Sequence, residues 1–408
     1  MIRILHTADW HIGVENYGRI DHKTGVHSRL RDFLVSLDSL VKDAIEKQVD
    51  LVLFCGDAFK NREPSETHQN ALARRLKKLS DAGIKVFMLV GNHDLPNAAG
   101  KSNALDIYRT LQVPGITVGR HPRVYVIDTK SGPVQVAAIP YPSRSSWLSR
   151  EGHSGKTLEQ LEEEMAANVA GLARRLSAEL EPDIPAVLCA HITVTGAVAG
   201  SEHCIMVGRD LAVPASALQQ GGFDYVALGH IHRQQVLAEN PPLVYSGSLD
   251  RIDFGEEKEK KGYVLVEVEK GRCSYNFYPL STRPFVTVRV KIKGKDPTAE
   301  ILERVEKSAD QRAILRLIIE CTAADYANIN HRQVRRFIDR HYYYLASINR
   351  ELTGEDGALR NPNLNEKLDP LAAFKEYLET AGVNGDKEEL VQRAESLYRK
   401  LKERDIYG

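Results

Sequence analysis

Five short apolar segments of this chain each run into polar side chains of the kinds that bind metal ions. Such runs, rich in Val, Leu and Ile, are typical of strands that are buried on both faces. Helical patterns separate them, for example at 28–47 and 65–80. Strands that alternate with helices predict an α/β fold, which binds ligands just beyond the ends of its strands. The five segments are residues 2–8, 50–55, 84–90, 186–190 and 223–229.

The residues that follow these segments carry imidazole, carboxylate and amide groups. Any one of them alone is more often a turn former or a satisfied polar group than a ligand. Several imidazoles that meet carboxylates at one edge, however, need cations to neutralise and coordinate them, and mixed nitrogen and oxygen donors suit divalent Mn, Fe or Zn. So many donors favour two ions over one. The donors are Asp9, His11, Asp57, Asn92, His93, Asp94, His191, His230 and His232.

The motifs DWH, GDAF, GNHD, AHITV and GHIH, in that order and each after an apolar segment, resemble the five motifs of the calcineurin-like dinuclear metallophosphoesterases. This resemblance implies a four-layer αββα sandwich within the α/β class. It also implies that Asp57 bridges two ions about 3.5–4 Å apart. The first ion would be held by Asp9, His11 and His232, and the second by Asn92, His191 and His230.

His93 falls outside this ligand set. The family pattern implies that it faces the leaving group of a phosphoester, where it would donate a proton to the departing sugar oxygen or support the transition-state charge. Asp94 is expected to orient its ring. The resemblance also implies that the two histidines of GHIH, His230 and His232, each reach a different ion. This requires both rings to point the same way, as residues i and i+2 of an extended strand do.

The segment GSLDRIDFGEE, soon after GHIH, is similar to the SbcD-type DNA nucleases, and this resemblance covers almost the full length. It implies two Mn(II) ions, with Mg, Fe or Zn as possible replacements. It also implies 3′-to-5′ exonuclease activity on duplex ends and endonuclease activity on single strands or hairpins, together with an SbcC-type SMC-like ATPase in double-strand-break repair. Lys60 stands where some of these nucleases carry histidine, which leaves the fine specificity open.

Two other classes of function stay open beside the nuclease. One is a metallophosphodiesterase or phosphatase that acts on small phosphoesters or phosphoproteins. This function leaves the C-terminal region without a role. The other is a catalytically silent scaffold, which the complete ligand set argues against.

Changes of pattern along the chain predict four segments. Residues 1–284 form the nuclease domain, 285–352 a small α+β domain, 353–368 a linker and 369–408 a helical tail. In the family the α+β domain caps the active site and grips DNA. A basic helix face beside a run of tyrosines suits phosphate contact and stacking, although a solvated helix followed by a core strand is as good an interpretation. These residues are Arg332, Arg335, Arg336, Arg340, Tyr342, Tyr343 and Tyr344.

The tail carries two amphipathic segments, which must dock on the chain itself or on a partner because short helices cannot bury their apolar stripes alone. The resemblance implies that they bind the SbcC-type ATPase. Family members also form homodimers, for which the segments 65–80 and 103–111 are candidates, although core packing produces the same amphipathicity. The apolar residues of the tail are Leu371, Phe374 and Leu378, then Leu390, Ala394, Leu397 and Leu401.

The balance of charged residues limits the kind of nucleic-acid-binding surface that the protein can have. Lys+Arg and Asp+Glu are equal at 55 each, which argues against a uniformly basic surface but not against a local basic groove. The loop 12–29, with Arg19, Lys23 and Arg29, would then lie near entering DNA, although an ordinary polar loop looks the same.

Cys55 and Cys189 lie in apolar runs, so we expect buried, reduced thiols. Without a signal-peptide or membrane-length apolar run, a cytoplasmic protein with no membrane partner is expected.

Overall fold

The computed structural model describes residues 1–96, 101–142, 157–198, 200, 212–219, 221–353, 370–380 and 387–405. They fall into two compact units. The first comprises Met1–Val286 with Arg312–Ile314, and the second comprises Thr287–Gln311 with Leu315–Gly408. Apart from Thr353, the expected linker at 353–368 lies outside the described residues.

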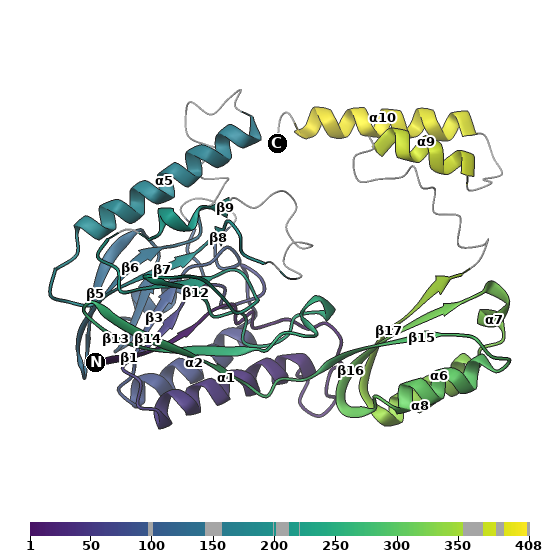
Figure 1. The fold of residues 1–408 in the computed structure, drawn as a ribbon, viewed down its shortest axis with the longest axis horizontal. Coiled ribbons are helices and arrows are strands. Elements are labelled where there is room, and N and C mark those ends of the chain that lie inside the picture. The colour runs from purple at the N-terminus through teal and green to yellow at the C-terminus, as the bar shows by residue number, and fades with distance from the viewer. Residues whose placement is uncertain are drawn as a thin grey trace. The chain divides into compact units, whose positions relative to one another are not determined.

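The first unit contains two six-stranded sheets that lie face to face (Figure 1). One sheet has the strand order β14-β13-β1-β2-β3-β4. Its strands β1 to β4 run parallel. Strand β13 pairs antiparallel with β1, and β14 pairs antiparallel with β13 at the edge of the sheet. The bounds are β1 Ile2–Thr7, β2 Leu51–Phe54, β3 Lys85–Leu89, β4 Ile116–Gly119, β13 Gly262–Glu269 and β14 Arg272–Pro279.

The second sheet has the strand order β11-β12-β10-β7-β6-β5. Its four central strands are parallel, and the two edge strands β11 and β5 are antiparallel to their neighbours. The five strands expected from the sequence therefore divide between the sheets, with β1, β2 and β3 in the first and β7 and β10 in the second. The bounds are β5 Arg123–Thr129, β6 Gly132–Ile139, β7 Ala186–His191, β10 Tyr225–Gly229, β11 Gln235–Glu239 and β12 Pro242–Tyr245.

Apolar side chains fill three layers of core in this unit. Leu51 and Leu53 of β2 pack between the sheets with Val187 of β7. Alternate residues on the same strand, Val52 and Phe54, face the opposite way, because successive strand side chains point to opposite faces. On that outer face lie the helices α1 (Ser28–Glu46) and α2 (Glu66–Asp81).

The helix α5 (Leu158–Ala178) covers the outer face of the second sheet and completes four layers (Figure 1). It begins with a capping box, in which the Thr157 hydroxyl accepts from the Gln160 N–H and the Gln160 side chain accepts from the Thr157 N–H. This helix was not among the elements expected from the sequence. The αββα sandwich itself is confirmed.

Shorter elements complete the first unit, and none of the helices in the described ranges is long and apolar enough to cross a membrane. These elements are α3 Asp106–Thr110, β8 Thr193–Val194, β9 Ala212–Val213, and the 3-10 turns η2 Ala215–Ala217 and η3 Phe254–Glu256.

The second unit contains the small α+β fold expected from the sequence, a three-stranded sheet of order β15-β16-β17 with helices beside it. Helix α6 begins at Pro297, where the Asp296 side chain caps it by accepting from the Ala299 N–H at 3.0 Å. The bounds are β15 Phe285–Lys291, α6 Pro297–Glu306, β16 Asp310–Cys321, α7 Ala323–Ala327, α8 His331–His341 and β17 Tyr342–Leu352.

Helix α8 is amphipathic, with Val334 and Ile338 buried. Its four arginines, the basic face expected from the sequence, are exposed. Tyr342 is different, because it is buried and its hydroxyl donates to the Val305 carbonyl at 2.9 Å. Of the three tyrosines, Tyr342 is therefore part of the core and is not available for stacking on bases.

The tail forms helices α9 (Pro370–Thr380) and α10 (Lys387–Asp405), and the ion pair between Lys375 and Glu395 joins them at 2.8 Å. Leu378 is buried, whereas Leu390 and Leu397 are exposed. The apolar stripe of α10 is thus only partly covered.

Candidate metal centre

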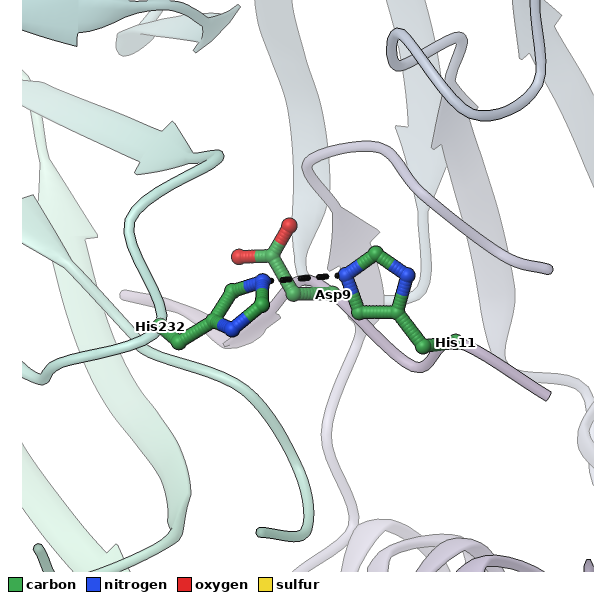
Figure 2. A group of neighbouring side chains, drawn as sticks. All are labelled: Asp9, His11 and His232. Atoms are coloured by element: carbon green, nitrogen blue, oxygen red, sulfur yellow. Dashed lines mark hydrogen bonds between the residues drawn. The ribbon is translucent and has the colours of Figure 1, made fainter. Parts of the chain in front are cut away.

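Side chains from the carboxyl ends of both sheets meet at one place in the first unit. Asp9 and His11 follow β1, and His232 follows β10 of the other sheet. Their ligand atoms lie within 4.8 Å of one another, and the Nε2 atoms of His11 and His232 are 3.0 Å apart. Figure 2 shows the two rings directed at each other beside the Asp9 carboxylate. All three residues are buried.

A second group lies around Asp57, which follows β2. Asp57, His191 and His230 also place their ligand atoms within 4.8 Å of one another. The side-chain oxygen of Asn92 lies 2.9 Å from Nε2 of His191 and 3.0 Å from Nδ1 of His230. Oδ2 of Asp57 lies 3.4 Å from Nε2 of His191 and 3.8 Å from Nε2 of His11, so it is close to both groups.

The hydrogen bond at Nδ1 of His191 fixes which ring nitrogen carries a proton. Nδ1 is 2.6 Å from the Cys55 carbonyl, which can only accept, so Nδ1 donates to it. Nε2 then faces two more oxygens, those of Asn92 and Asp57, and the Asp57 carboxylate favours a positive charge at this nitrogen. Burial lowers the pKa of His191, but Asp57 and Asp9 outweigh burial and raise it to about 9. Without a metal ion that charge is a proton, and a divalent cation fits the same position.

At His11 and His232 the protonation of the rings is set by different neighbours. Burial and the neighbouring His232 hold the pKa of His11 well below its ordinary value, so the ring is neutral. Nδ1 of His232 donates to Oε1 of Glu256 at 2.8 Å, which turns its Nε2 towards His11, and one of the two facing Nε2 atoms carries the hydrogen of their 3.0 Å contact. A divalent metal ion would bind both rings through Nε2 once it displaces that hydrogen. The donor set therefore suits a divalent metal site.

The backbone is strained where these residues lie. Asp9, His11, Asp57 and His230 have φ values of 52°, 41°, 63° and 99°. Each such conformation costs on the order of 1–3 kcal/mol in a residue other than glycine, and such costs concentrate at functional sites. The GHIH segment is thus not extended as expected, because β10 ends at Gly229. The two rings nevertheless reach different groups, His230 beside Asn92 and His232 beside His11.

Gly56 shows why the loop before Asp57 needs a residue without a side chain. Its φ is +100°, and a Cβ there would lie 2.3 Å from Nδ1 of His191. The ring could not then bond to the Cys55 carbonyl.

His93 lies at the rim of the site, with 31% of its side chain exposed. Its backbone N–H donates to Oδ1 of Asp57 at 2.8 Å, and its Nε2 is 4.0 Å from Oδ2 of the same residue. Nδ1 donates to the carbonyl of Lys60 at 2.7 Å. The Lys60 backbone thus orients the ring, and the expectation that Asp94 does so was wrong.

Asp94 instead fixes the backbone around Asp57. Its carboxylate accepts from the N–H groups of Asp57, Ala58 and Gly91 at 2.9, 3.1 and 3.0 Å. Burial and the charge of Asp57 raise the pKa of Asp94 to about 7. A carboxylate suits this place because it offers two acceptor oxygens to three donors.

Arg29 was expected near entering DNA, and the structure places it elsewhere. The side chain is fully buried in the first turn of α1, where it donates to Asp32 at 2.8 Å and to the carbonyl of Arg251 at 2.6 Å. Asp32 in turn accepts two hydrogen bonds from Arg283, both at 2.6 Å. Arg29 is therefore a structural residue.

Sequence reasoning missed Glu256 and Lys261, which are both buried. Their Oε2 and Nζ atoms form an ion pair at 2.9 Å, while Oε1 of Glu256 contacts His232. The only sequence signal was the segment GSLDRIDFGEE, which contains Glu256 and ends four residues before Lys261, because the charge run around them is typical of a solvated surface.

Comparisons with known proteins support a metallophosphoesterase. Residues 2–234 match the family model described as calcineurin-like phosphoesterase. The SbcD component of nuclease SbcCD from Bacillus subtilis strain 168 is 28% identical over 78% of this chain and 79% of its own length. The corresponding protein of Rhodobacter capsulatus is 29% identical over 76% of this chain and 76% of its own length. That of Escherichia coli K12 is 27% identical over 82% of this chain and 81% of its own length. The resemblance to the SbcD-type nucleases is thereby confirmed.

Proposed function

This chain belongs to the calcineurin-like phosphoesterases, and we propose that it is a DNA nuclease that uses two divalent metal ions, preferably Mn(II). The observation that carries the proposal is the position of the Asp57 carboxylate, which lies near one cluster of nitrogen and oxygen donors on each side. The SbcD relatives, which are named as parts of a nuclease and match about four-fifths of the chain, support DNA as the substrate.

In this proposal the two donor groups hold one ion each. Asp9, His11 and His232 hold the first ion, Asn92, His191 and His230 hold the second, and Asp57 bridges them. Bound ions would lower the pKa of a water molecule and neutralise charge on the phosphoryl oxygens.

His93 acts on the leaving group. Because Nδ1 is bonded to the Lys60 carbonyl, the ring has a fixed orientation and offers Nε2 to the substrate. As an imidazolium it donates the Nε2 proton to the departing sugar oxygen, and its partial exposure lets solvent restore that proton.

The remaining segments serve DNA and partner binding. We assign 1–284 to the nuclease domain, 285–352 to a DNA-capping domain, 353–368 to a linker and 369–408 to the binding of an SbcC-type ATPase. The exposed arginines of α8 support phosphate contact, and the exposed Leu390 and Leu397 of α10 support a partner. We also propose a homodimer, in line with the exposed Ile107 and Leu111 near α3.

A panel of substrates tests the nuclease proposal. The purified chain is incubated with Mn(II) and with linear duplex DNA, single-stranded circles or para-nitrophenyl phosphate. We expect cleavage of both DNA substrates, with 3′-to-5′ polarity on end-labelled duplexes, and loss of cleavage in an Asp57→Asn variant. Turnover of para-nitrophenyl phosphate without cleavage of DNA would instead support a small-phosphoester phosphatase.

A further inference from the structure

Glu256 and Lys261 form a buried ion pair next to the proposed metal site. Glu256 lies at the end of η3 and Lys261 just before β13, and both side chains are buried. Nζ of Lys261 also bonds to the His232 carbonyl at 3.0 Å and to Oε2 of Glu259 at 2.7 Å. The pair therefore holds both the ring and the backbone of His232.

The contacts of Glu256 require a carboxylate. Oε1 faces Nδ1 of His232 at 2.8 Å, and Oε2 faces both Nζ of Lys261 at 2.9 Å and the backbone N–H of Ile252 at 3.0 Å. All three neighbours are donors, so a glutamine would turn its amide N–H groups towards a donor in either orientation.

Stability alone does not account for this pair. Burying two charges costs several kcal/mol per ion, and well-packed apolar residues in place of a buried pair are often as stable or more so. A carboxylate that accepts from the far nitrogen of a ligand histidine, in contrast, fixes the tautomer and raises the basicity of the other nitrogen.

The second donor group has a neutral contact at the corresponding place. Nδ1 of His191 donates to the Cys55 carbonyl, which carries no charge. His232 and His191 thus differ in what lies behind the ring, a carboxylate in one case and a peptide group in the other. This difference distinguishes the surroundings of the two donor groups.

We propose that Glu256 is a positioning residue that selectively strengthens metal binding at the position formed by Asp9, His11 and His232. The inference rests on the proposed two-metal function and adds a difference in affinity between the two ions. Lys261 supports Glu256 by binding its second oxygen and the carbonyl of His232.

Metal titration tests this inference without reference to catalysis. Free Mn(II) is measured by electron paramagnetic resonance as the metal is added to the wild-type chain, Glu256→Gln and Glu259→Gln. Glu259 is the matched control, because it also pairs with Lys261 but the structure gives it no contact with the His232 ring. We expect the wild type to bind two ions, Glu256→Gln to bind one of them about 10–100-fold more weakly, and Glu259→Gln to resemble the wild type.

The outcomes separate the two proposals. A wild-type chain that binds no Mn(II), or only one ion, contradicts the two-metal function itself. Two ions bound with unchanged affinity by Glu256→Gln, or an equal loss at both positions, overturns the role of Glu256 and leaves the two-metal function intact.

A second measurement does not depend on the folding of a variant. In the Zn(II)-loaded, ¹⁵N-histidine-labelled wild type, long-range ¹H–¹⁵N spectra report which ring nitrogen carries the proton. We expect His232 to be protonated on Nδ1, and protonation on Nε2 would overturn the inference.

Discussion

Oδ2 of Asp57 lies 3.4 Å from Nε2 of His191, and the carboxylate favours a proton or a cation at that nitrogen. Since the metal-free pKa of His191 is raised to about 9, the ring is protonated at pH 7. A metal ion needs the neutral ring, so it must displace that proton.

Metal binding should therefore release about one proton at pH 7. The affinity should fall as pH is lowered from about 9, by about tenfold per pH unit for one displaced proton. Isothermal titration calorimetry with Mn(II) in two buffers of different ionisation enthalpy measures the release. Equal apparent enthalpies in both buffers would contradict the displacement of a proton.

His93→Ala should keep the metal and lose hydrolysis. Because His93 is outside both donor groups as we assign them, the number of bound Mn(II) ions should stay the same, while kcat on duplex DNA should fall about 10²–10⁴-fold. Lys60→Ala is the control, because the ring is bonded to the Lys60 carbonyl, which that variant retains. A His93→Ala enzyme that turns over at the wild-type rate would show that the role is wrongly assigned.

Asp94→Asn should destabilise the loop of Asp57. Because Oδ2 accepts from Asp57 and Gly91 and Oδ1 accepts from Ala58, the amide in its better orientation leaves the Ala58 N–H facing a donor, at a cost of about 1–3 kcal/mol. The free energy of unfolding in urea with a chelator present measures this loss. Mn(II) affinity should fall in the same variant, and an unchanged affinity with full stability would contradict the supporting role of Asp94.

Arg29→Met should lower the free energy of unfolding by about 3–5 kcal/mol, because it leaves the buried Asp250 without its ion-pair partner and removes one of the two arginines that pair with Asp32. DNA affinity at permissive temperature, and its salt dependence, should stay unchanged. Arg19→Ala, at an exposed position of the same loop, should not affect stability. A stable Arg29→Met protein with weakened DNA binding would restore the interpretation of Arg29 as a DNA contact.

Deletion of residues 369–408 should leave nuclease activity on linear duplex DNA unchanged and abolish binding to an SbcC-type ATPase. Co-purification of the two tagged chains measures the second effect. The paired change Leu390→Ser and Leu397→Ser, both at exposed positions of α10, should weaken binding without removing the helix. Full binding by the truncated chain would rule out the tail as the docking segment.

Much of the fold was predictable because its signals are local. The apolar runs before Asp9, Asp57 and Asn92 form strands at the expected places, and the small α+β fold follows the pattern after residue 284. The capping box at Thr157 is likewise a local signal, and it marks the start of α5, the helix that the apolar pattern did not predict.

The sequence by itself determined the five strands that lead into the site and the chemical types gathered there, because period and residue type act within a few positions. Only the tertiary structure decided which sheet each strand joins and which partner each polar group finds. His11 meets His232 across 221 residues of chain, Asp94 bonds to backbone rather than to His93, and the charges of Glu256 and Arg29 are buried. The reason is that burial and hydrogen bonding depend on distances in space, which a sequence pattern does not contain.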